Sequence, residues 1–92
     1  MKQFDWNEKK NDWLKTKRGI SFERIVEALD MGNLLADIDH PDQKKYSQQR
    51  IMYVWVYDYV YAVPYVQTDE VIFLKTIYPS RKAKSRYKGN YK

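Results

Sequence analysis

The segment RIMYVWVYDYVYAVPYV, residues 50–66, carries the strongest strand signal in the chain. Its aromatic and aliphatic residues alternate with a period of two on either side of Asp58. This pattern predicts two strands, Arg50 to Tyr57 and Tyr59 to Val66, which pair as a hairpin that turns at Asp58. Pro64 has no N–H to donate to a ladder, so it indicates a sheet edge or a bulge.

The alternation sorts the side chains of this hairpin onto two sides of the expected sheet. One side would be aromatic, with Tyr53, Trp55, Tyr57, Tyr59, Tyr61 and Tyr65. The other would be mainly aliphatic, with Met52, Val54, Val56, Val60, Ala62 and Val66. We expect the aliphatic side to meet the helices of the protein, and the aromatic side to be half-covered or open.

Two helices are predicted before the hairpin. The first runs from Glu8 to Lys17, with Asn7 as its N-cap and Gly19 at its end. The second follows the cap residue Ser21 and stops near residues 31–33. Its apolar residues recur at positions i, i+3, i+4 and i+7, namely Phe22, Ile25, Val26 and Leu29. This spacing is typical of a helix with one face in the core.

The remaining segments complete an expected α+β fold. Phe4 to Trp6 is either a short strand or a hydrophobic lead-in. Residues 37–49 are predicted to form a long polar loop. Val71 to Tyr78 is predicted to be a third strand, which follows the hairpin. We therefore expect two N-terminal helices packed on a three- to four-stranded antiparallel sheet, followed by a short basic C-terminal helix or tail. The length suits a single domain, residues 1–92.

Positive charge is concentrated at the C-terminal end of the chain. Seven of the seventeen basic residues lie from position 75 onward, where no acidic residue occurs, whereas the preceding part is slightly acidic. A local field of this kind attracts polyanions and weakens with salt. RNA is the polyanion that we consider first.

The composition excludes several classes of site. The chain has no cysteine and one histidine, so it has no disulfide framework, no thiolate zinc site and no cysteine nucleophile. Its scattered acids form no paired-carboxylate motif, and no glycine-rich phosphate loop is present. The pattern therefore predicts neither a metal site nor a cofactor. The absence of a long apolar run favours a soluble, cytoplasmic protein that does not associate with membranes.

Cationic and tyrosine side chains remain as candidates for chemistry, and they suit cleavage of RNA by its own 2′-hydroxyl group. That reaction needs stabilisation of a phosphorane and transfer of two protons. The candidate catalytic residues are Arg81, Lys75, Tyr87 and His40. Each also has a plain structural interpretation: a surface arginine, a lysine that guards a sheet edge, a tyrosine packed on the core and a solvated loop histidine. Candidate RNA-binding residues are Arg50, Lys82, Lys84 and Arg86.

The N-terminal segment FDWNEKKNDWLKTKRGISFE, residues 4–23, resembles the opening of the BrnT-type toxins. Residues that match the family pattern in order and spacing are Phe4, Trp6, Lys10, Lys17, Gly19, Ser21, Phe22 and Glu23. Later matches follow in the same order, at Asp39-His40, Gln49-Arg50, Ser80-Arg81, Ala83 and Tyr87. The chain departs from the pattern at Asn7, Leu14 and Arg18, and its segment between Arg81 and Tyr87 is shorter.

The resemblance implies a RelE-like endoribonuclease toxin from a bacterial type II toxin-antitoxin system. Such a protein inhibits translation, arrests growth and is neutralised by a cognate DNA-binding antitoxin of ribbon-helix-helix or similar type. Its substrate is RNA, with the ribosome as a further candidate partner. Two alternatives stay open: a non-catalytic protein on the same scaffold that binds nucleic acid or a ribosomal partner, and a subunit that docks a partner helix on its aromatic face.

Overall fold

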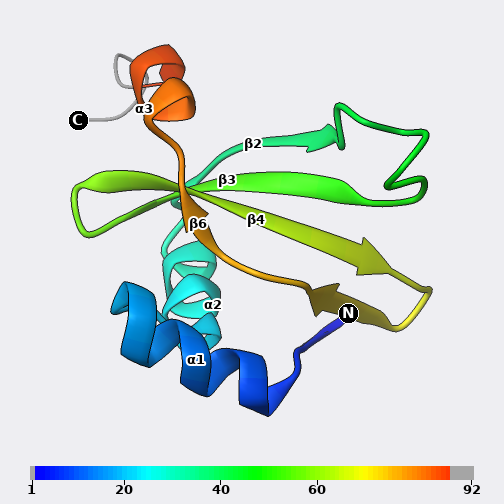
Figure 1. The fold of residues 1–92 in the computed structure, drawn as a ribbon, viewed down its shortest axis with the longest axis horizontal. Helices are drawn as coiled ribbons and strands as arrows, with labels where there is room; N and C mark the ends of the chain where they lie inside the picture. The colour runs from blue at the N-terminus through cyan, green and yellow to red at the C-terminus, as the bar shows by residue number, and fades with distance from the viewer. Residues whose placement is uncertain (1, 88–92) are drawn as a thin grey trace.

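The computed structural model describes residues 2–87, which form an α+β fold of three helices and a six-stranded mixed sheet (Figure 1). The elements in chain order are β1 (Gln3–Asp5), α1 (Glu8–Arg18), α2 (Phe22–Asp30), β2 (Leu34–Asp39), β3 (Arg50–Val56), β4 (Tyr59–Gln67), β5 (Val71–Leu74), β6 (Tyr78–Pro79) and α3 (Arg81–Tyr87). Within these residues no helix is both long enough and apolar enough to cross a bilayer.

Local side-chain chemistry sets the ends of α1 and α2, as the sequence predicts. The Asn7 side chain accepts a hydrogen bond from the Lys10 N–H at 3.0 Å, and the Ser21 hydroxyl accepts one from the Arg24 N–H at 3.1 Å. Gly19 ends α1 in the left-handed conformation, with φ of 67°. A side chain is unfavourable there, so glycine suits this position.

A buried asparagine joins the two helices. Asn11 is fully buried, and its side-chain oxygen accepts a hydrogen bond from the Phe22 N–H at 2.8 Å. Its amide nitrogen donates to the Glu23 carboxylate at 2.7 Å. This hydrogen bond is the main reason why the pKa of Glu23 lies below its ordinary value. One side chain of α1 thus fixes the first turn of α2.

The sheet is larger than the sequence predicts. Its strand order is β1-β5-β4-β3-β2, with β6 beside β4, and β1 pairs with β5 in parallel while the other pairs are antiparallel. The expectation of three or four antiparallel strands was wrong because β2 occupies residues assigned to a connection and a loop. Its two aspartates, Asp37 and Asp39, lower the strand propensity of the segment. Both carboxylates pair with Arg50 on the neighbouring strand.

The predicted strand from Val71 to Tyr78 exists but is interrupted. Leu74 pairs with Tyr65, and Tyr78 pairs with Ala62, so this side of the ladder holds one residue more than β4 between the two pairs. Such an extra residue is a β-bulge, which bends a strand and redirects its side chains. The Lys75 N–H still donates to the Pro64 carbonyl at 2.8 Å. The bulge therefore begins directly after the position where Lys75 joins the sheet.

The turn between β3 and β4 determines which side chains share a face. It contains two residues, Tyr57 and Asp58, with φ of 54° and 60°. Two consecutive residues with positive φ are typical of a type I′ turn, the preferred two-residue hairpin connection. Val56 consequently pairs with Tyr59, and every later pair follows from this register.

This register overturns the expected aromatic face. Directly paired residues share a face, and Val54 pairs with Tyr61 whereas Tyr53 pairs with Ala62. The tyrosines of β4 therefore lie with the aliphatic residues of β3, on what we call the helix face, where Tyr65 joins the core beneath α1 and α2. The opposite side, which we call the groove face, carries Ala36, Ile38, Ile51, Tyr53, Ala62, Pro64 and Tyr78.

A glycine at the second turn position is expected to stabilise the protein. Asp58→Gly removes a side chain from a left-handed residue and should raise the free energy of unfolding by about 0.5–1 kcal/mol. Thermal denaturation should show this as a melting temperature about 4 °C higher. Asp69→Gly is the matched control, because Asp69 is not among the residues of 2–87 with positive φ. An equal gain from both substitutions would refute the explanation.

Candidate functional site

The groove face of the sheet forms the floor of the candidate site. One row of cross-strand partners is Ala36, Tyr53, Ala62 and Tyr78, from β2, β3, β4 and β6. The next row is Ile38, Ile51 and Pro64. In the first row two tyrosines alternate with two alanines, and the small residues leave space beside the aromatic rings. The floor is thus apolar and partly aromatic.

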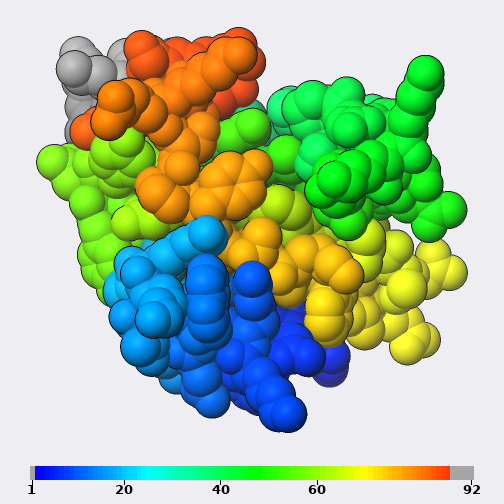
Figure 2. Space-filling view, viewed as in Figure 1, coloured from blue at the N-terminus to red at the C-terminus, as the bar shows by residue number. Residues whose placement is uncertain are grey.

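Two walls rise from this floor, α3 on one side and the loop of residues 40–49 on the other. Figure 2 shows the helix, in orange and red, and the loop, in green, standing apart with a hollow between them. Ser80 starts α3 by accepting a hydrogen bond from the Ala83 N–H at 3.2 Å, and Ala83 is buried against the sheet. The His40 N–H donates to the Gln49 carbonyl at 3.0 Å, which closes the base of the loop.

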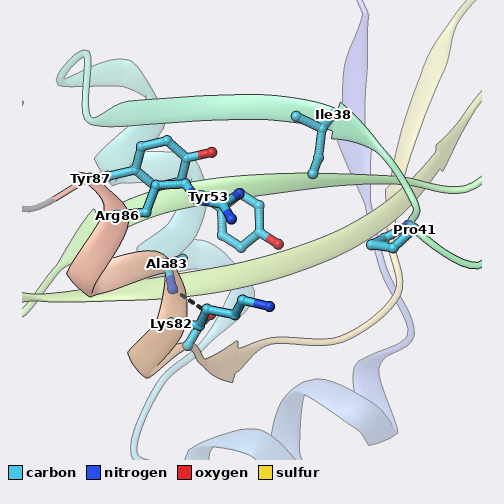
Figure 3. Close-up of a pocket in the computed structure, with 8 residues that line it drawn as sticks. Ile38, Pro41, Tyr53, Lys82, Ala83, Arg86 and Tyr87 are labelled. Carbon is cyan, nitrogen blue, oxygen red and sulfur yellow. Dashed lines mark hydrogen bonds between the residues drawn. The ribbon is translucent and has the colours of Figure 1, made fainter.

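The end of the hollow nearest α3 is a pocket of about 290 Å³, which we call the tyrosine pocket. Its lining residues are Ile38, Pro41, Tyr53, Ser80, Lys82, Ala83, Arg86 and Tyr87. The rings of Tyr53 and Tyr87 lie 5.7 Å apart between centroids. Figure 3 shows these rings and Arg86 on one side, with Ile38 and Pro41 across from them.

The end nearest the loop is a second pocket of about 310 Å³, which we call the histidine pocket. Its lining residues are His40, Tyr46, Gln49, Pro64, Lys75, Thr76 and Tyr78. The ring of His40 lies 4.3 Å from that of Tyr46, between centroids. The consecutive residues His40 and Pro41 line one pocket each. Both pockets lie on the groove face of the sheet, and we refer to the two together as the groove.

A hydrogen bond fixes the tautomer of the histidine. His40 Nδ1 accepts from the Asp42 N–H at 3.0 Å, which places the proton of the neutral ring on Nε2. In this arrangement His40 can donate a hydrogen bond to a phosphate or a base through Nε2. Nδ1 is thus engaged within the loop.

The groove is positively charged. Lys75, Lys82 and Arg86 line it, and none of the described residues that line the two pockets is acidic. Lys82 and Arg86 also line a third, open pocket of about 710 Å³, together with Arg81 and Ser85. This pocket extends the positive charge over α3. An anionic chain is the ligand that this distribution favours.

The tyrosines of the groove floor are held in their neutral form. Burial raises the pKa of Tyr53, and the nearby Tyr78 and Tyr87 hydroxyls raise it further. Burial likewise raises the pKa of Tyr78, with a smaller contribution from Tyr46. Neutral phenols donate hydrogen bonds and offer ring faces for stacking, but they are poor proton acceptors. Tyr53 and Tyr78 are therefore suited to binding.

The structure gathers most of the candidate residues from the sequence around the groove. His40 and Lys75 line one pocket, although 35 positions separate them in the chain. Lys82, Arg86 and Tyr87 line the other. Arg81, the first candidate for catalysis, is the first residue of α3 and is exposed on its outer surface, not in either pocket.

Two other candidates lie away from the groove. Arg50 is on the helix face, where its guanidinium contacts the Asp37 carboxylate at 3.1 Å and the Tyr65 hydroxyl at 3.2 Å. Burial is the main reason why the pKa of Tyr65 rises to about 12, with a further contribution from Asp37. The Lys84 ammonium lies over the ring of Tyr59, 4.5 Å from its centroid. Both cations therefore already have partners within the fold.

The catalytic and RNA-binding candidates from the sequence did not include the tyrosines of the floor and the loop, Tyr46, Tyr53 and Tyr78. The signal that singles out Tyr53 and Tyr78 is their pairing with the same small residue, Ala62, and this depends on the strand register. Within residues 2–87 no three histidine, aspartate or glutamate side chains lie close enough together to hold a metal ion. No protein-family model, curated protein or solved structure matches the chain.

Proposed function

We propose that this protein is an endoribonuclease toxin that binds single-stranded RNA in the groove and cleaves it without a metal ion. The observation that carries the proposal is the lining of the groove. Three cations and several tyrosines surround an apolar floor, with no acid among the described lining residues. Cleavage of RNA in this groove would inhibit translation and arrest growth.

Single-stranded RNA fits the groove better than a duplex does. Proteins that hold single strands combine cations along the phosphate backbone with aromatic rings on which bases stack. Here Lys82 and Arg86 line the tyrosine pocket beside Tyr53 and Tyr87. The unpaired bases of a single strand can enter pockets of this kind, whereas those of a duplex are stacked on one another.

The histidine pocket is the proposed place of the reaction. The 2′-hydroxyl gives its proton to water and its oxygen bonds to phosphorus, while the bond from phosphorus to the 5′-oxygen breaks and that oxygen takes a proton from water. Lys75 would neutralise the charge on the phosphorane, and His40 would donate a hydrogen bond to it through Nε2. Arg81, which lines the open surface of α3 with Lys82 and Arg86, would bind the backbone where it leaves the groove.

The proposed scaffold rests on the resemblance to BrnT-type toxins, and several of the matched residues have structural roles in the fold. Gly19 ends α1, Ser21 caps α2, and Phe22 is fully buried with its ring stacked on Trp6 at 5.6 Å. Residues with such structural roles are expected to persist when a scaffold is shared. We accordingly propose a RelE/BrnT-like scaffold and, as partner, a cognate DNA-binding antitoxin that covers the groove.

One observation favours a second function, RNA binding without cleavage. Nδ1 of His40 is occupied by the Asp42 N–H, and the floor tyrosines are held neutral. The groove residues thus offer hydrogen-bond donors and cations more readily than a general base. A toxin-like protein that blocks RNA by binding it would have the same lining.

Cleavage of a labelled single-stranded RNA by the purified protein in excess EDTA tests the proposal. We expect RNA fragments that end in 2′,3′-cyclic phosphate, and no cleavage of the same sequence made with 2′-deoxynucleotides. Lys75→Ala should slow cleavage by about a hundredfold, the effect of removing one donor to a developing oxyanion. Lys17→Ala is the control, because Lys17 is an exposed lysine of α1.

The outcome separates the two functions. Cleavage that depends on the 2′-hydroxyl and on Lys75 supports the ribonuclease. The second function is established instead if the protein arrests growth in cells and binds RNA with an affinity that depends on the groove residues, but leaves the RNA intact. Equal rates of RNA cleavage by Lys75→Ala and Lys17→Ala would show that the reaction does not take place in the histidine pocket.

A further inference from the structure

The tyrosine pocket has the features of a binding site for a single planar ring. Its volume of about 290 Å³ is small. Aromatic rings line one side and the apolar side chains of Ile38 and Pro41 the other (Figure 3). A flat ring of nucleobase size fits between an aromatic and an aliphatic wall, and stacking on tyrosine is available to any base.

The sheet register keeps one tyrosine ring accessible. Tyr53 has alanines as direct neighbours on both sides, Ala36 on β2 and Ala62 on β4. Neither alanine is large enough to cover the ring, and Tyr53 remains half-buried although it lies at the centre of the sheet. An aromatic ring between two small residues on the floor of a pocket can accept a stacked ligand.

Two cations stand at the rim of this pocket, on the same side of α3. Lys82 and Arg86 are four positions apart, which places them one above the other on a helix. Both line the pocket and the open surface outside it. They are therefore positioned to hold a phosphate attached to a ring that sits inside.

We propose that the tyrosine pocket is a subsite for one unpaired nucleobase, with the adjoining phosphate held by Lys82 and Arg86, and that it also binds a free nucleoside monophosphate. The subsite deepens the proposed function, on which its role in RNA recognition rests. It prefers purines, because a larger ring shares more area with the aromatic wall.

Calorimetric titration with adenosine monophosphate, uridine monophosphate and ribose 5-phosphate tests this subsite without any cleavage step. We expect adenosine monophosphate to bind about tenfold more tightly than ribose 5-phosphate, with uridine monophosphate between them. Tyr53→Leu should remove this advantage and Tyr53→Phe should retain it, since only the ring is needed. Trp13→Leu is the matched control, because Trp13 is an exposed aromatic residue of α1, which packs on the helix face.

Each outcome of the titration supports or overturns the base subsite. Equal affinity for adenosine monophosphate and ribose 5-phosphate, or an unchanged preference in a folded Tyr53→Leu protein, overturns the base subsite. Loss of the preference in Tyr53→Leu but not in Trp13→Leu supports the base subsite. If RNA is cleaved but the nucleotide does not bind, the subsite fails and the ribonuclease stands. If the nucleotide binds as expected and RNA is neither bound nor cleaved, the proposed function is wrong but the nucleotide subsite stands.

Discussion

The double variant Lys82→Glu/Arg86→Glu is expected to bind single-stranded RNA at least about a hundredfold more weakly than the wild type at low salt. Each substitution removes a phosphate contact and adds a charge that repels the backbone. Both side chains are exposed, so the fold should be retained. Neutralisation of one phosphate of a single strand contributes about 0.7 to the slope of log affinity against log salt, so two lost contacts should lower it by about 1.4.

The matched control has the same net charge as Lys82→Glu/Arg86→Glu, but its substitutions lie on the other side of the molecule. Lys9→Glu/Lys17→Glu alters two exposed lysines of α1, which packs on the helix face (Figure 1). Filter binding or fluorescence anisotropy at several salt concentrations measures both slopes. An affinity loss of the same size in both variants would mean that RNA responds to the overall charge of the protein and not to the groove.

Asn11→Ala is expected to lower the free energy of unfolding by about 3 kcal/mol. The substitution leaves the buried N–H of Phe22 without an acceptor and removes the hydrogen bond to Glu23. It also leaves a small cavity between the helices. Urea denaturation followed by circular dichroism should show a lower midpoint with an unchanged slope. Asn7→Ala is the comparison, because Asn7 caps α1 at an exposed position. It should lower the free energy of unfolding by about 1 kcal/mol.

The pH dependence of this difference provides a second readout. The pKa of Glu23 is lower in the folded protein than its ordinary value of 4.5, chiefly through the hydrogen bond from Asn11. The stabilisation from ionised Glu23 is therefore fully present above pH 4.5 and is lost as the pH falls through the folded-state pKa. The stability gap between the wild type and Asn11→Ala should narrow over that range. A gap that is constant down to pH 3 would exclude the Glu23 contribution.

The N-terminal helices show how much a sequence can reveal when the signals are local. Asn7, Gly19 and Ser21 act within a few residues of their own positions, and each performs the predicted capping role. The apolar spacing of α2 likewise identified a helix with Phe22 and Ile25 fully buried. Asn11 was not singled out, because its partners lie on another helix and only the packing of α1 against α2 brings them together.

The candidate site was predictable in its charge but not in its assembly. The concentration of basic residues after position 75 is visible in the sequence, and Lys75, Lys82 and Arg86 do line the groove. Their meeting with His40 depends on β2, which begins in a segment that the sequence assigns to a connection. Arg50 resembled the other cations in sequence, and only its position opposite two aspartates of β2 separates it from them.

The sequence alone determined the fold class, the helix ends, the existence of the hairpin and the position of the basic segment, since each follows from contacts between near neighbours. The tertiary structure decided which side of the sheet each tyrosine faces. That outcome depends on whether the turn holds one residue or two, because a shift of one residue moves every side chain of a strand to the opposite face. The two left-handed residues Tyr57 and Asp58 set the register. They place Tyr53 on the groove floor and send Tyr61 and Tyr65 to the core.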